Sequence, residues 1–88
     1  MEKVIKISSK SNPNSVAGMI AYIINNNDIC EIHCIGAGAI NQAIKGMIIA
    51  KSFLSPIGKN ITFDPSFGST KIGKDNITMI NFVIKVNK

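Results

Sequence analysis

The chain has 88 residues and a formal net charge of +5; 45% of its residues are hydrophobic, 6% are aromatic, and every basic side chain is a lysine. This length suffices for one domain with one modest core, and the composition makes that core aliphatic rather than aromatic. The hydrophobic content excludes a disordered chain, and the charge permits an acidic partner such as nucleic acid without resembling a polybasic tail.

The first two predicted elements are a strand and a helix joined by a polar loop. Residues 3–8 alternate between apolar and polar side chains, as a strand does, and the loop SSKSNPNS follows. In this loop Asn12 precedes Pro13, which suits a helix N-cap followed by proline at the first helical position. The predicted helix runs from Pro13 to Asn26 and leaves Tyr22 opposite its apolar stripe. Tyr22 is then placed to stack on a base, to meet another subunit, or to have no specific role.

A second predicted strand covers residues 29–35, after a turn at residues 25–28. Cys30 and Cys34 share one face of this strand, and His33 lies on the other face. Two thiols are too few for a disulfide framework, and metal ligands with a defined spacing do not accompany them. We therefore expect buried, reduced, inert cysteines, with no metal and no cofactor. The alternation predicts a sheet covered by helices on one face, with His33 solvated on the open face.

Two glycines, Gly36 and Gly38, punctuate the turn into the second predicted helix. Glycine permits unusual backbone dihedrals and lets another group come close. The turn also delivers the chain to a helix N-terminus, where unpaired N–H groups favour an anion. Neither a dinucleotide fingerprint nor a phosphate loop is present, because Asn41 stands at the third glycine position and no lysine–hydroxyl pair follows. Anion binding and simple tight packing of strand against helix both remain open for these glycines.

The second predicted helix, residues 39–54, has an apolar arc of about 220° on a helical wheel. One sector of the arc has large side chains that we expect to face the sheet, namely Ile40, Ile44, Met47 and Leu54. The adjoining sector is nearly all small and consists of Ala39, Ala43, Gly46, Ala50 and Phe53. A row of small side chains lets another helix approach closely, either the first helix of the same chain or a second copy. Because the arc exceeds what a two-layer domain needs, we interpret this row as an oligomer interface and expect a dimer or tetramer.

Two further strands complete the predicted fold. Pro65 interrupts the apolar alternation of a third strand, which fits an edge position or a bulge. Residues 73–76 form a hairpin turn, and the last strand covers residues 77–86 with Ile80, Phe82, Ile84 and Val86 inward.

The resulting order, βαβαββ, predicts a single two-layer α/β (α+β) domain over residues 1–88. A strand–helix–strand crossover makes the first two strands parallel. If these strands are neighbours, the loops at residues 8–14 and 36–41 lie side by side at the carboxyl edge of the sheet. Ligands of open α/β sheets bind at that edge.

Three segments carry a resemblance to a known family. SSKSNPNSVAG (residues 8–18), EIHCIGAGAINQAIK (residues 31–45) and IAKSF (residues 49–53) resemble stage V sporulation protein S, a small bacterial family of about this length. The resemblance covers nearly the whole chain and implies an Alba-like fold, a mixed four-stranded sheet with two helices on one face. It implies a role in sporulation, developmental or cell-cycle regulation. Alba proteins are dimers that bind DNA or RNA through a basic loop, the start of the second helix and a hairpin arm.

Compared residue by residue, this sequence matches only part of the nucleic-acid-binding surface of Alba proteins. Lys10 fits the basic loop, and Lys71 and Lys74 fit the hairpin arm. The arginine-rich turn of Alba proteins is here Gly36 to Gly38, and a lysine of their second helix is here Gln42. The candidate residues for binding nucleic acid or an anion are Lys10, Ser11, Asn12, Asn14, Gly36, Ala37, Gly38, Asn41, Gln42, Lys45, Lys71 and Lys74.

Three functions follow as hypotheses. The first is a non-enzymatic, oligomeric regulator whose lysines contact nucleic-acid phosphates. The second is a binding module for a small anionic ligand at the paired helix N-termini. The third is a protein-assembly module.

An enzyme is not expected, because His33 has no obvious acidic or nucleophilic partner and the carboxylates form no recognisable pair. The start of the chain has no signal-peptide pattern, and no apolar run approaches the roughly 20 residues of a membrane span. We therefore expect a cytoplasmic protein without a membrane partner.

Overall fold

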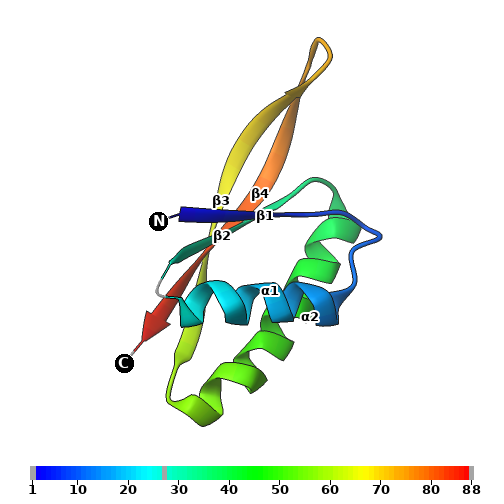
Figure 1. The fold of residues 1–88 in the computed structure, drawn as a ribbon. Coiled ribbons are helices and arrows are strands. Elements are labelled where there is room, and N and C mark those ends of the chain that lie inside the picture. The colour runs from blue at the N-terminus through cyan, green and yellow to red at the C-terminus, as the bar shows by residue number, and fades with distance from the viewer. Residues whose placement is uncertain (1, 27, 88) are drawn as a thin grey trace.

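Two helices cover one face of a four-stranded sheet in the computed structural model, which describes residues 2–26 and 28–87 (Figure 1). Met1 and Lys88 of the predicted domain, and Asn27 of the predicted turn, lie outside the described residues. The elements in chain order are β1 (Glu2–Ile7), α1 (Pro13–Asn25), β2 (Ile29–Cys34), α2 (Ala37–Leu54), a short 3-10 helix η1 (Ser55–Ile57), β3 (Asn60–Ile72) and β4 (Asp75–Asn87). This order confirms the predicted βαβαββ arrangement.

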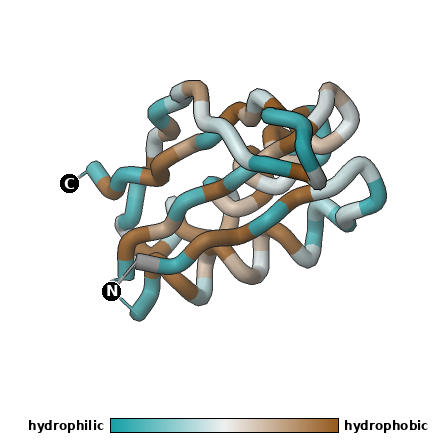
Figure 2. The backbone as a smooth tube through the Cα atoms, turned by 90° about the horizontal axis from the view of Figure 1, so that it is seen from above, coloured by the Kyte–Doolittle hydropathy of each residue, from teal (hydrophilic) through white to brown (hydrophobic). Residues whose placement is uncertain are grey.

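The strands lie in the order β1-β2-β4-β3. β1 and β2 are parallel neighbours, as predicted, whereas β4 runs antiparallel to both β2 and β3. Pro65 lies on β3, an edge strand, where its missing N–H removes no bond from the interior of the sheet. Hydrophobic and hydrophilic residues alternate along the strands (Figure 2), so that one face of the sheet is apolar.

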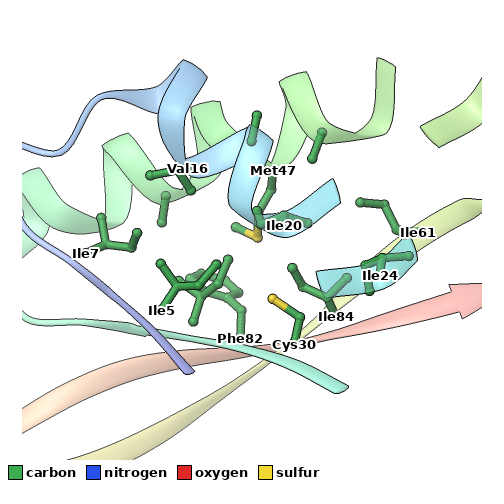
Figure 3. Close-up of a cluster of buried hydrophobic side chains, with 14 of the residues drawn as sticks. Ile5, Ile7, Val16, Ile20, Ile24, Cys30, Met47, Ile61, Phe82 and Ile84 are labelled. Atoms are coloured by element: carbon green, nitrogen blue, oxygen red, sulfur yellow. The ribbon is translucent and has the colours of Figure 1, made fainter. Parts of the chain in front are cut away.

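The apolar faces of the sheet and the helices meet in one core. Ile5, Ile32 and Phe82 are neighbours across β1, β2 and β4. All three belong to one cluster of buried residues with Val16 of α1 and Met47 of α2. Figure 3 shows Ile5 and Phe82 on the sheet side of this cluster and Val16 and Met47 on the helix side. The buried strand residues follow the period of two and so confirm the predicted inner face. The exception is Val86 near the end of β4, which was predicted to point inward and is 43% exposed.

Both cysteines lie on this inner face. Cys30 and Cys34 are free thiols with no exposed surface. Burial, with a smaller contribution from the Glu31 carboxylate, raises the pKa of the Cys30 thiol to about 12. Burial also raises the pKa of the Cys34 thiol above its ordinary value. Both side chains are therefore neutral thiols near pH 7, which is the unreactive form.

Helix α2 packs differently from the sequence-based expectation. Its four small residues, Ala39, Ala43, Gly46 and Ala50, are buried. A Cβ atom on Gly46 would lie 2.6 Å from Val16 Cγ1 and 3.3 Å from the Pro13 carbonyl oxygen, both in α1. Gly46 therefore packs against α1 within one chain, and the burial of all four small residues corrects their interpretation as an oligomer interface.

The two ends of the predicted apolar arc are exposed instead. Phe53, the fifth member of the small row, is 49% exposed, and Ile44, which we expected to face the sheet, is 42% exposed. Met47 and Leu54 are buried as predicted. The reason is that α2 is rotated about its axis relative to the expected orientation. Its close approach to α1 turns the small side of α2 inward and moves Ile44 outward.

The β3–β4 hairpin is longer than the rest of the sheet. Each of its strands has 13 residues, whereas β2 has six and its last partner on β4 is Ile80, opposite Cys34. Residues 68–79, which we call the arm, therefore continue as a two-stranded ribbon beyond the sheet (Figure 1). The arm turns at Gly73, whose φ of 62° lies in the left-handed region that favours glycine. The arm accounts for the elongated shape, with a longest extent of 45 Å.

Candidate nucleic-acid interface

The loops that follow β1 and β2 lie side by side, as their parallel pairing predicts. Gln42 Nε2, in the first turns of α2, donates a hydrogen bond of 2.8 Å to the Ser11 carbonyl oxygen in the β1–α1 loop. A Cβ atom on Gly38 would lie 2.8 Å from Ser9 Cβ. The two loops thus touch, and Gln42 ties them together with its amide group.

The β1–α1 loop is ordered by its own serines. The Ser8 N–H donates to Ser11 Oγ at 2.9 Å, and the Ser11 N–H donates to the Ser8 carbonyl at 3.1 Å. The Lys10 N–H donates to Ser8 Oγ at 3.2 Å. These bonds fix the backbone on both sides of Lys10, whose side chain is exposed. A cation on a preorganised loop loses little backbone entropy when it meets a phosphate.

The N-termini of α1 and α2, which lie next to each other, are capped differently. At α1, Asn12 Oδ1 accepts hydrogen bonds from the N–H groups of Asn14, at 2.8 Å, and Ser15, at 3.3 Å, so the predicted N-cap is confirmed. At α2 the N-cap is Gly36, which has no side chain with which to cap the helix. Asn12 therefore occupies the donors at α1, whereas those of the first turn of α2 have no side-chain cap and suit an incoming anion.

The two glycines of the turn serve different purposes. Gly36 has a φ of 90°, and a Cβ atom there would meet nothing within 4 Å, so this position needs glycine for its backbone conformation. Gly38 has no such φ and needs glycine because Ser9 lies close by. The packing explanation that was left open thus holds for Gly38, while Gly36 sets the direction in which the chain enters α2.

The loops and the arm lie at the same end of the sheet. Because β4 runs antiparallel to β2, the residues that precede Ile80 extend past the carboxyl end of β2. Lys45 lines a shallow depression with Asn12 and Asn14, so the structure brings these three predicted residues together. Ser11 and Gln42 are joined beside them.

The remaining predicted residues lie around this cluster. Ala37 and Asn41 are exposed in the first turns of α2. Lys71 and Lys74 are exposed toward the tip of the arm rather than in the cluster. The candidate residues therefore form two groups at one end of the sheet, one on the loops and one on the arm.

Sequence reasoning missed a hydrogen-bonded contact between two side chains on the open face of the sheet. His33 Nε2 lies 2.8 Å from Glu31 Oε1, and both side chains are about one-fifth exposed. This corrects the expectation of a solvated His33 without an acidic partner. The signal was present in the sequence, because residues two apart on a strand share a face. Within residues 2–26 and 28–87 no group of three potential metal ligands comes together, and none of the helices there is long and apolar enough to cross a bilayer.

Comparison with known proteins agrees with this architecture. A family model described as stage V sporulation protein S matches residues 3–87. Among solved structures, Alba from Thermoplasma volcanium has a TM-score of 0.61 and 19% sequence identity, over 93% of this chain and 98% of that one. At this identity the likeness concerns the fold alone, and it confirms the Alba-like fold that the sequence predicted.

Proposed function

Since the chain belongs to the stage V sporulation protein S family and has an Alba-like fold, we propose that it is a non-enzymatic regulator that binds DNA or RNA. The family is named for sporulation, and we propose that the protein acts in sporulation or in a related developmental or cell-cycle process. The observation that carries the proposal is the position of the exposed Lys10, the uncapped N-terminus of α2 and the arm at one end of the sheet.

The charges at this end suit a polyanion. The two loops and the arm contain Lys10, Lys71 and Lys74 but only one carboxylate, Asp75. Lysines that contact phosphates release condensed counterions, so affinity falls as salt rises, with a log–log slope of about 0.9 per contact on duplex DNA. Backbone N–H groups at the start of α2 add contacts that need no side chain.

Charge reversal at the two groups of candidate residues tests the proposal. We expect the Lys10→Glu/Lys74→Glu variant to bind oligonucleotides at least about tenfold more weakly, with a salt slope lower by about 2 units. Fluorescence anisotropy at several salt concentrations measures both quantities. Lys59→Glu is the control, because Lys59 precedes β3 at the opposite end of the sheet, where its Nζ donates to Asn25 Oδ1 at 3.2 Å.

An unchanged affinity of the double variant would place the binding surface elsewhere. If the wild-type protein binds neither DNA nor RNA at low salt, the proposal is wrong. The alternative would then be a small anion at the uncapped N-terminus of α2.

Self-association is a second proposal, and it rests on a different surface from the small-residue row. Ile44 and Ile48 lie one turn apart on α2 and are 42% and 60% exposed. Adjacent exposed aliphatic side chains of this size favour contact with a second copy. We expect the Ile44→Gln/Ile48→Gln variant to sediment as a smaller species than the wild type.

Ile57→Gln is the matched control for this experiment, because Ile57 is 57% exposed but lies in η1. A wild-type protein that sediments as a monomer at all concentrations would contradict the self-association proposal. So would a double variant with an unchanged sedimentation coefficient.

A further inference from the structure

A groove lies on the open face of the sheet, between the carboxyl ends of β1 and β2 and the arm. We call it the open-face groove; its lining residues are Val4, Lys6, Ile7, His33, Ile35, Thr70 and Met79. Thr70 and Met79 belong to the arm, so the twist of the long hairpin brings the arm beside the end of β1. Its volume of about 490 Å³ is within the range of about 300–1,000 Å³ that is usual for small-molecule sites.

The groove combines an apolar wall with a few polar groups, one of which is the cation of Lys6. Val4, Ile35 and Met79 supply aliphatic surface, while Lys6, His33 and Thr70 supply polar atoms. The lining residues contain no carboxylate. Outside the lining, Glu31 Oε1 holds His33 Nε2 at 2.8 Å and so fixes the position of the imidazole ring. A ligand with a flat apolar body, polar edges and an attached anion matches this set of groups.

An unpaired hydrogen-bonding group lies next to the groove. Asn81 is paired with His33 across β2 and β4 and is two residues from Met79 on the same face of β4. Its Oδ1 atom is buried and has no hydrogen-bond partner in the described structure. Its Nδ2 atom lies over Gly68, where a Cβ atom would overlap it. A buried carbonyl without a donor is unfavourable, and a ligand N–H reaching it after a rotation of the amide group would remove that cost.

The groove is continuous with the end of the sheet to which we assign nucleic-acid binding. Ile7 directly precedes the loop that carries Lys10, and Ile35 directly precedes Gly36. A chain of phosphates bound along the loops and the arm would therefore pass the mouth of the groove, beside Lys6.

We propose that the open-face groove holds one unstacked base of a single-stranded nucleic acid, so that the protein prefers single strands to duplexes. This inference rests on the proposed function, and it names the class of nucleic acid. A base has a flat apolar face and N–H and carbonyl groups along its edge, which the apolar wall and the polar groups of the groove would meet. In a duplex the same base is stacked and paired, so that binding it in the groove requires unstacking and unpairing, which cost free energy. In a single strand the base is already unpaired.

Three oligonucleotides of equal length test the preference, namely a mixed-sequence single strand, its duplex, and an abasic strand with the same phosphates. At one salt concentration we expect the base-bearing single strand to bind about tenfold more tightly than the other two, which corresponds to about 1.4 kcal/mol. The abasic strand should still bind through its phosphates.

Two threonines of the arm provide a matched pair of variants. Thr70 lines the groove, whereas Thr78 is exposed on the opposite face of the arm. Thr70→Leu adds bulk to the groove without changing charge, and we expect it to abolish the preference for bases while leaving abasic binding and the salt slope unchanged. Met79→Ala, which removes part of the wall, should lower the preference several-fold. Thr78→Leu should retain it in full.

The outcomes separate this inference from the proposed function. Equal affinity for base-bearing and abasic strands, or a Thr70→Leu variant that keeps the preference, would overturn the base site and leave phosphate binding intact. No binding of any oligonucleotide would overturn both. A change in oligomeric state on Thr70→Leu, measured by sedimentation velocity, would assign the groove to a second copy of the chain and overturn the base site.

Discussion

Strands β3 and β4 run through both the four-stranded body of the sheet and the arm, but the two regions are stabilised in different ways. In the body, Ile61 of β3 and Ile84 of β4 are buried beneath the helices, with 1% and 4% of their surface exposed. In the arm, Ile72 is 58% exposed. The arm is therefore held by its strand-to-strand hydrogen bonds, whereas apolar burial adds most of the stability of the body. We therefore expect substitutions in the body to change the free energy of unfolding, and substitutions in the arm to change the affinity for nucleic acid.

The largest effect of a single substitution is expected where the two helices that cover the body touch each other. Gly46→Ala places a methyl group 2.6 Å from Val16 Cγ1 and 2.9 Å from Val16 Cβ, so the helices must move apart. We expect the free energy of unfolding to fall by about 1–3 kcal/mol, measured by chemical denaturation. Gly18→Ala in α1 is the control, because its methyl group meets nothing within 4 Å and should stabilise the helix by about 0.5–1 kcal/mol. Equal effects of the two substitutions would refute close packing at Gly46.

Alkaline pH should also lower the free energy of unfolding, because the two cysteine thiols are buried under the helices in the body of the sheet. Burial raises the pKa of Cys30 to about 12, from an ordinary value of 9.0. Above pH 9 the unfolded chain loses this proton while the folded chain keeps it, so the free energy of unfolding should fall as pH rises from 9 toward 12. The slope for one thiol is about 1.4 kcal/mol per pH unit at most.

Denaturant unfolding at several pH values on both sides of pH 9 measures this slope. The comparison is with Cys30→Ala, whose stability should decline less steeply because it lacks this thiol. Parallel pH profiles for the two proteins would show that the Cys30 thiol ionises equally easily in the folded and unfolded states.

The smallest effect is expected when the same substitution, isoleucine to valine, is made in the body and in the arm, which compares the two regions directly. Ile84→Val removes one buried methyl group from the body and should lower the free energy of unfolding by about 1 kcal/mol. Ile72→Val in the arm should change it by about 0.5 kcal/mol or less, since the side chain is already largely in water. Thermal and denaturant unfolding of both variants provide the measurement. A loss at Ile72 as large as that at Ile84 would mean that the arm is buried in solution, for example against a second copy.

Much of the candidate site could be predicted from local sequence signals. Asn12 before Pro13 identified the N-cap of α1, and the βαβ order placed the two loops side by side on the condition that β1 and β2 are neighbours, which they are. These features depend on hydrogen bonds between near neighbours in the chain and on the handedness of the crossover, which a sequence carries locally. The open-face groove could not be predicted in this way, because Lys6 and Thr70 come together only through the twist of a 13-residue hairpin.

The sequence by itself determined the order of the elements, the inward face of β2 and of β4 up to Ile84, and the burial of Cys30 and Cys34, because a period of two assigns each side chain to a face. Only the tertiary structure decided how α2 is rotated. The wheel shows a wide apolar arc, but the close fit of Gly46 against Val16 selects which part of that arc is buried and leaves Ile44 in solvent. Rotation of a helix about its own axis is set by the shape of its neighbours, and no spacing within one helix encodes that shape.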